Sequence, residues 1–339
     1  MQTFAPMRKR QDPQVAATKI FDLVKAEMAL VEDEFQRQAA SNIQVINYLC
    51  EYLRASGGKR VRPALLILSN YAVGGKGSDD KVIRLATVME MLHTATLVHD
   101  DIIDNADVRR GRSSVNARFG NQTAVLMGDW LYMSAFETTV KERSLEIIDI
   151  LTQLTRKMTE GELIQLTAIG QLDISETEYF DILHRKTAFL FSACCEVGAI
   201  LGGADHAQQE AMRDYGRDLG VAFQIVDDIL DLTSDADQLG KAAGTDLLEG
   251  KLTLPLISLL EKEPSLRSVF ERIMLVGDYA EFSRSDLKEK LVSHGTLDEI
   301  HERAKMYVSS ARKSIDVLPE TEYRSSLEGI LSFVIDRSM

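Results

Sequence analysis

The sequence predicts an all-α protein that forms one helical domain. Its six prolines leave residues 64–254 without any, and so long a proline-free span favours helices packed on helices. Apolar residues recur near positions i, i+3, i+4 and i+7 along most of the chain, which is the period of amphipathic helices. No tract rich in Pro, Gly or Ser marks a linker, and no tandem repeat is present. We therefore expect a loose N-terminal arm over residues 1–15 and a single domain over residues 16–339.

The expected helices follow one another with short connections. In chain order the helical patterns cover residues 15–39, 43–55, 64–75, 80–104, 121–142, 144–170, 176–201, 207–232 and 254–262. The segment "SGGKRVRP" at 56–63 ends the second pattern, a loop with three arginines follows the fourth, and a polar loop with spaced glycines occupies 233–253. Smaller helices are expected from about residue 265 onward.

Charge and hydropathy exclude several classes of protein. A formal net charge of −13 at pH 7 argues against a general affinity for nucleic acid or anionic lipid. No apolar run reaches the roughly 18–20 residues of a membrane span, and no hydrophobic region of a signal peptide follows the basic N-terminal residues. We therefore expect a cytoplasmic protein. Cys50 stands alone and Cys194 and Cys195 are adjacent in an apolar segment, so we interpret all three as reduced core thiols.

Two aspartate triplets with the same spacing are the strongest sign of a functional site. They are Asp100, Asp101 and Asp104 in "LVHDDIIDNADVRRGR", and Asp227, Asp228 and Asp231 in "FQIVDDILDL". At a helix C-terminus these carboxylates repel one another and the helix dipole disfavours them, so something positive must lie there. A single DDxxD is often only a solvated acidic helix end. Two copies predict the two halves of one metal cage, and carboxylates without His or Cys favour Mg²⁺.

Basic side chains near the triplets indicate a substrate with phosphate groups. Each alone reads as a solvated surface residue, but together, in a chain with surplus negative charge, they predict a phosphate-rich pocket. They are Lys59, Arg60 and Arg62 in "GGKRVRP", Arg109 and Arg110 after the first triplet, Lys186 beside Thr187 in "HRKTAFLF", and Lys241 and Lys251 around the loop of the second. Together with the many apolar helices, they predict a substrate that has a polyphosphate head and an apolar tail.

Six segments, taken in order, resemble one family, the all-trans isoprenyl diphosphate synthases. They are "GGKRVRP", "LVHDDIIDNADVRRG", "EGELIQL" with Gln165, "KTA", "FQIVDDILD" and "GKAAGTDLLEGKLTLP", and the resemblance spans about residues 50–260. The resemblance implies a bundle of antiparallel helices around a central cavity. It also implies a homodimer that condenses isopentenyl diphosphate onto an allylic diphosphate in a Mg²⁺-dependent 1'-4 reaction.

The resemblance also assigns roles to individual residues. It implies three Mg²⁺ ions between the triplets, with Asp100, Asp104 and Asp227 as direct ligands and with Asp101, Asp228 and Asp231 supporting them or contacting substrate. The residues that it places at the allylic diphosphate are Arg109, Lys186, Gln224 and Lys241, and Thr187 and Lys251 are expected to bind substrate without being assigned to one of the two. Those implied for isopentenyl diphosphate are Lys59, Arg62, His93 and Arg110, and the alternative for His93 is a satisfied core histidine.

The implied reaction needs no protein nucleophile. The allylic C–O bond ionises, the double bond of isopentenyl diphosphate attacks the cation, and a proton is lost to the departed diphosphate. Three other functions stay open at this point. They are a terpene cyclase, whose second motif usually differs, a non-catalytic subunit of a heteromeric synthase, which is expected to have lost one triplet or the basic set, and an acidic bundle that binds Ca²⁺ weakly.

Residues just before the first triplet predict the product length. Ala95 and Thr96 lie about one helical turn N-terminal to Asp100, at roughly 1.5 Å per residue, so they flank the substrate tail. Bulky aromatics at this place stop growth in short-chain members of the family, whereas both residues here are small. We expect about eight isoprene units, C40 with C35–C50 allowed, as in quinone side chains, with a farnesyl or geranylgeranyl product as the alternative. The floor of the tunnel is expected among larger residues such as Phe136, Ile147 and Leu151.

Overall fold

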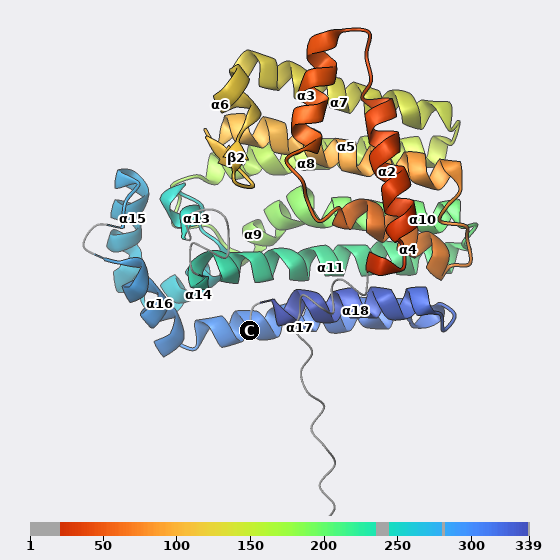
Figure 1. Ribbon diagram of the computed structural model, residues 1–339. Coiled ribbons are helices and arrows are strands. Elements are labelled where there is room, and N and C mark those ends of the chain that lie inside the picture. Colours follow the sequence, from red (N-terminus) through yellow and green to blue (C-terminus); the bar gives the residue numbers. More distant parts are fainter. Residues whose placement is uncertain (1–20, 235–243, 280–281, 338–339) are drawn as a thin grey trace, which may run out of the picture.

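Helices form nearly all of the regular structure in the computed structural model, which describes residues 21–234, 244–279 and 282–337. One layer consists of α5 (Asp80–Ile103), α7 (Asn121–Lys141) and α8 (Leu145–Ala168). Beneath it (Figure 1) lie α4 (Val61–Ala72), α10 (Phe189–Leu201) and α11 (His206–Thr233), and α17 (Thr296–Ser314) and α18 (Glu322–Asp336) pack outside them. The predicted all-α helical bundle is confirmed.

The remaining elements cross or close this bundle. α2 packs across α5 and α4, and α13 to α16 gather at the end of the bundle where α11 finishes (Figure 1). These elements are α2 (Lys25–Gln38), α3 (Gln44–Arg54), β1 (Val108–Arg109), β2 (Arg112–Ser113), α6 (Val115–Phe119), α9 (Glu176–Leu183), η1 (His184–Ala188), α13 (Thr245–Leu248), α14 (Leu254–Lys262), η2 (Pro264–Leu266), α15 (Arg267–Val276), α16 (Arg284–Ser293) and η3 (Ile315–Val317). The arm expected over residues 1–15 lies outside the described residues.

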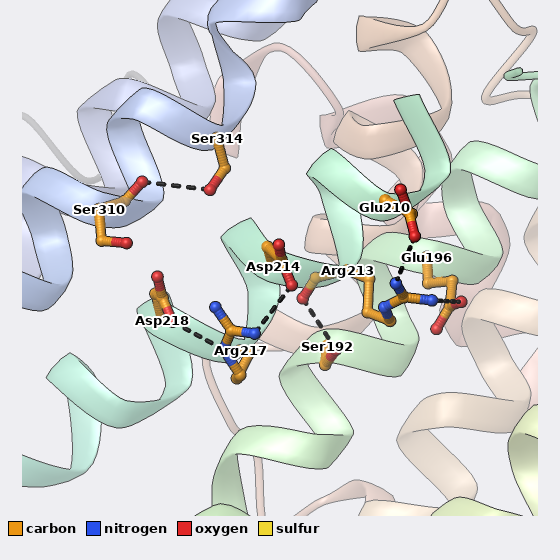
Figure 2. Close-up of polar contacts among 9 residues, drawn as sticks. All are labelled: Ser192, Glu196, Glu210, Arg213, Asp214, Arg217, Asp218, Ser310 and Ser314. Carbon is orange, nitrogen blue, oxygen red and sulfur yellow. Dashed lines mark hydrogen bonds and ion pairs between the residues drawn. The ribbon is translucent and has the colours of Figure 1, made fainter. Parts of the chain in front are cut away.

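Close packing of α10 against α11 fixes the direction of the helix that carries the second triplet. A Cβ added at Gly216 of α11 would come within 2.5 Å of the Phe191 carbonyl of α10, so only glycine allows this approach. Figure 2 shows the polar contacts at the solvent edge of the same pair of helices, where the Arg213 guanidinium lies 3.4 Å from Glu196 and 3.3 Å from Glu210. The hydroxyl of Ser192 donates to the Arg213 carbonyl at 2.8 Å.

Two further expectations concern the core and the membrane. Cys50, Cys194 and Cys195 are free and buried, and burial raises the pKa of Cys50 to about 11 and that of Cys195 to about 12. The three cysteines are therefore core thiols, as predicted. Within the described ranges, no helix combines the length and hydropathy that crossing a membrane requires.

Candidate active site

The first aspartate triplet closes α5. That helix begins at a conventional cap, where the Asp79 side chain accepts from the Lys81 backbone N–H at 2.9 Å, and it ends one residue before Asp104. Lys251 donates to Asp104 at 3.1 Å, and Arg109 forms an ion pair with the buried Asp101. The positive charge that the sequence requires at this helix end is thus supplied by side chains of the same chain.

A tight hairpin, rather than the expected loop, follows the first triplet. Val108 pairs with Ser113 and Arg109 with Arg112 in an antiparallel ladder. The two turn residues, Arg110 and Gly111, both have positive φ angles, of 52° and 73°, which is the signature of a type I′ turn. The hairpin directs Arg109 toward Asp101 and brings the Arg110 guanidinium to the Gly57 carbonyl of the "GGKRVRP" segment.

The second triplet lies in the last turns of α11, and Asp228 is at its centre. Tyr179 donates to one Asp228 oxygen at 2.6 Å and Gln224 donates to the other at 2.9 Å. The pKa of Asp228 is raised well above its ordinary value, mainly because the carboxyl is buried and also because the charge of Asp246 is close to it. Asp231 is also buried, whereas Asp227 is more exposed and lies 3.2 Å from the Arg337 guanidinium of α18.

A single turn of π-helix places the residues of "HRKTA" beside this triplet. The helix expected over 176–201 is continuous, but η1 changes its hydrogen bonding at His184–Ala188, as often occurs at functional sites. Thr187 donates to Gln224 at 3.0 Å, and Lys186 forms an ion pair with Glu162 of α8. α8 can approach η1 closely because Gly161 has no side chain, whereas a Cβ at this position would lie 2.6 Å from the Arg185 side chain.

Two cavities bracket the triplets, and Lys186 lines both. The larger, of about 220 Å³, has polar walls from Gln224, Asp228 and Lys251 and apolar walls from α8, α9 and the segment before α14. The other, of about 160 Å³, is lined by Asp100, Lys186 and Glu162 and by Thr96, Tyr132 and Met158. Because Lys251 also pairs with Asp104, it connects the first triplet to the cavity of the second.

Three of the residues expected to bind isopentenyl diphosphate, Arg62, His93 and Arg110, form a basic cluster, whereas Lys59 lies on the side of Asp227 and Arg337. Arg62 is partly buried, its Nε atom is buried and unpartnered within the described structure, and its guanidinium stacks 5.1 Å from the Phe191 ring centre. His93 is largely buried, and desolvation and the charge of Arg62 lower its pKa well below the ordinary value, so its imidazole is neutral. Lys59 lies 5.7 Å from the Phe333 ring centre. An orphaned buried donor beside these groups is typical of a site completed by an anion.

The donor set of the triplets fits Mg²⁺. In the described part of the chain no three His, Cys, Asp or Glu side chains converge to enclose an ion on their own. Of the three carboxylates in each triplet, one or two are expected to contact a metal directly. This is the number that Mg²⁺ takes from protein when substrate phosphates and water complete its coordination shell. Lys251 and Arg337 now occupy two of these carboxylates, Asp104 and Asp227, where a metal would compete with them.

Several site residues escaped sequence reasoning. Asp246 stands inside the quoted "GTDLLEGK" segment and Glu162 inside "EGELIQL", so spacing within those motifs was an available signal for both. Tyr179 and Arg337 gave no signal, because only the fold brings α9 and α18 to the second triplet. Lys241, predicted at the allylic diphosphate, lies outside the described residues.

The residues predicted to set chain length differ in their surroundings. Thr96 lines the cavity beside Asp100, whereas Ala95 is fully buried and is not among the residues that line this cavity. The expected floor residues Ile147 and Leu151 are buried, and Phe136 packs partly buried against the core.

Comparison with known proteins decides the family. The profile of the polyprenyl synthetase family matches residues 43–291. The chain belongs to this family. It is 36% identical to octaprenyl diphosphate synthase of Escherichia coli (strain K12) over 94% of this chain and 98% of the relative. A short chain isoprenyl diphosphate synthase of Methanothermobacter thermautotrophicus is 35% identical over 94% of this chain and 99% of its own length.

The solved structures agree with this membership. A crystal structure of polyprenyl synthase from Caulobacter crescentus CB15, complexed with calcium and isoprenyl diphosphate, superposes with a TM-score of 0.89 at 35% identity. The match covers 98% of this chain and 100% of that one. Polyprenyl synthetases are prenyltransferases, so the predicted enzyme class and fold are both confirmed.

Proposed function

We propose that this polyprenyl synthetase is a long-chain all-trans polyprenyl diphosphate synthase that adds isopentenyl diphosphate repeatedly to an allylic diphosphate. The observation that carries the proposal is that the same lysines serve both aspartate triplets. Lys251 pairs with Asp104 and lines the cavity that contains Asp228, and Lys186 lines both that cavity and the one beside Asp100. Both triplets are intact and the described basic residues cluster around them, which supports an active enzyme over a non-catalytic subunit. The similarity to octaprenyl diphosphate synthase supports a long product.

Asp100, Asp104 and Asp227 would hold the metal, which we propose to be Mg²⁺, with three ions when substrate is bound. The Caulobacter crescentus polyprenyl synthase is complexed with calcium and isoprenyl diphosphate, which supports a divalent cation as a partner of the diphosphate. When bound, the metal supplies Lewis-acid chemistry at the leaving diphosphate. Asp228 accepts hydrogen bonds from Tyr179 and Gln224, and in this fixed position it would orient the second triplet toward the metal.

The described basic residues form two groups, and each group would bind one of the two substrates. Lys186, Thr187, Gln224 and Lys251 line the cavity at the second triplet and would bind the allylic diphosphate, with Arg109 on the side of the first triplet. Lys59, Arg62, His93 and Arg110 would bind isopentenyl diphosphate. A neutral His93 donates one hydrogen bond without adding to the repulsion among its arginine neighbours. With this division, the double bond of one substrate would meet the ionising carbon of the other.

The proposed product has about eight isoprene units, with seven to ten allowed. One relative of nearly equal identity has a short-chain name, so the similarity to octaprenyl diphosphate synthase supports a long product but does not fix the number of isoprene units. The local surroundings support a long product, because Thr96 beside Asp100 and the neighbouring Ala95 are both small. An aromatic side chain at Thr96 would enter the cavity beside Asp100, and one at the buried Ala95 would displace neighbouring side chains toward it.

We also propose a homodimer through α7. Its residues Met127 and Leu131 are buried in the core, whereas Leu126 and Met133 are 68% and 62% exposed. Such an exposed apolar face is typical of an interface. A cytoplasmic location remains a prediction from the sequence.

The experiment that tests the proposed function is an incubation of purified protein with radiolabelled isopentenyl diphosphate, an allylic primer and Mg²⁺, followed by chromatography of the products. We expect a ladder that ends near eight units, and EDTA should abolish it. Accumulation of only three- or four-unit products would support the short-chain alternative. A cyclic hydrocarbon would indicate a terpene cyclase, and no product would contradict the proposal.

A further inference from the structure

Arg60 adopts a backbone conformation that arginine ordinarily avoids. It stands between Lys59 and Arg62, immediately before α4, with φ 48° and ψ 39°, in the left-handed region. Residues other than glycine are disfavoured there and persist only where the surroundings hold them. Two glycines, Gly57 and Gly58, precede it with positive φ angles of their own, so the whole segment is sharply curved.

Two carboxylates from different helices hold the Arg60 side chain. Its Nε donates to Glu32 of α2 at 2.6 Å, and its Nη1 donates to Glu90 of α5 at 2.6 Å. The side chains of Arg60 and Glu90 are only 12% and 4% exposed. A planar guanidinium suits this double contact, because its fork reaches two acceptors at once, which a lysine does not reproduce.

The same clamp faces the basic cluster. Glu90 is the carboxylate whose charge acts on Arg62 and Arg110 as well as on Arg60, so it offsets repulsion among three arginines. Arg60 has both ends of its guanidinium engaged by carboxylates, so it is not free to bind a diphosphate itself. Its neighbour Arg62 is the one whose charge acts on His93 and is influenced by Arg110.

We propose that the clamp Glu32–Arg60–Glu90 is a positioning device that holds residues 57–62 in the curve needed to bind the diphosphate of isopentenyl diphosphate. This inference rests on the proposed function. It gives α2, which begins before the region matched by the family profile, an indirect part in the substrate site, through Arg60. Glu32 and Glu90 act through Arg60 and do not contact the substrate.

The test replaces Arg60 with alanine and measures each substrate separately. Arg60→Ala should raise KM for isopentenyl diphosphate about ten- to a hundredfold, as expected for a misplaced binding loop, while KM for the allylic substrate changes less than about twofold. Arg60→Lys should restore only part of the loss, and Glu90→Gln should show the same selectivity. Arg37→Ala is the matched control on α2, because Arg37 is 73% exposed and its ion pair with Glu34 lies away from the site.

A second readout separates this proposal from the proposed function. Calorimetric titration with inorganic diphosphate and hydrogen exchange of the backbone amides at 57–62 need no turnover. Weaker diphosphate binding and faster exchange in Arg60→Ala, measured well below its melting temperature where the variant is folded, would support the clamp even if the wild-type protein made no product. Unchanged binding and exchange, or a loss of both substrates in step with a loss of folded protein, would overturn it.

Discussion

Replacement of Asp100 by asparagine should make the metal-free protein more stable and nearly inactive. Burial, opposed by Lys186 and reinforced by Glu162 and Asp104, raises the pKa of Asp100 from 3.8 to about 6. The folded chain therefore binds this proton more tightly than the unfolded chain. Its contribution to stability is present below about pH 4, falls as the pH rises, and is lost above about pH 6. The difference between the pKa of 3.8 in the unfolded chain and about 6 in the folded chain corresponds to about 3 kcal/mol, by which the charged Asp100 destabilises the folded state at pH 8. Asp100→Asn should relieve this destabilisation.

Thermal unfolding in EDTA, at pH 5.5 and pH 8, measures this effect. We expect Asp100→Asn to melt several degrees above the wild type at pH 8, with a smaller difference at pH 5.5, while its turnover with Mg²⁺ falls by orders of magnitude. Asp149→Asn, at an exposed carboxylate of α8, is the control and should change neither property. A melting temperature at pH 8 equal to or below that of the wild type would refute the reasoning, as would near-normal turnover.

Three other predictions follow from the same site. Ala95→Tyr should shorten the products to about three or four units while the first condensation continues, because it fills space without touching the aspartates, whereas Ala95→Ser should leave the length unchanged. Product chromatography that still shows the wild-type length would mean that the tail does not pass Ala95. Arg337→Ala removes a cation from Asp227, so metal titration without substrate should show tighter Mg²⁺ binding, and equal or weaker binding would count against competition at this carboxylate. Leu126→Glu combined with Met133→Glu should convert dimer to monomer in sedimentation at micromolar concentration, and a wild type that is already monomeric would contradict the proposed interface.

Elements with a strong period were predictable from the sequence. The ranges expected for the helices at 80–104 and 207–232 agree with α5 and α11 to within one residue at each end. α11 is amphipathic, whereas α5 is apolar on most faces and its limits are marked by the aspartates that flank its apolar run. The aspartate triplets and most basic residues were found because their spacing is local. These features were sufficient to predict the fold class and the enzyme class.

Features that depend on distant parts of the chain were not predictable. The turn of π-helix at η1 packs closely against α8, and no intrinsic propensity of the residues "HRKTA" predicts it. The hairpin after the first triplet was expected as a loop, since strands of two residues have no period to detect. Arg337 and Glu32 reach the site from the two ends of the chain, so only the tertiary structure brings them together.

Binding of Mg²⁺ in the presence of an unreactive thiolo analogue of the allylic diphosphate tests the single metal cage most directly. Calorimetry on the wild type, Asp100→Ala and Asp227→Ala compares the two triplets under one condition without turnover. If the triplets hold one cage around one diphosphate, either substitution alone should abolish the joint binding of metal and analogue, while each variant keeps its fold. Retention of wild-type joint binding by either variant would contradict the account, because the two triplets would then act as separate sites.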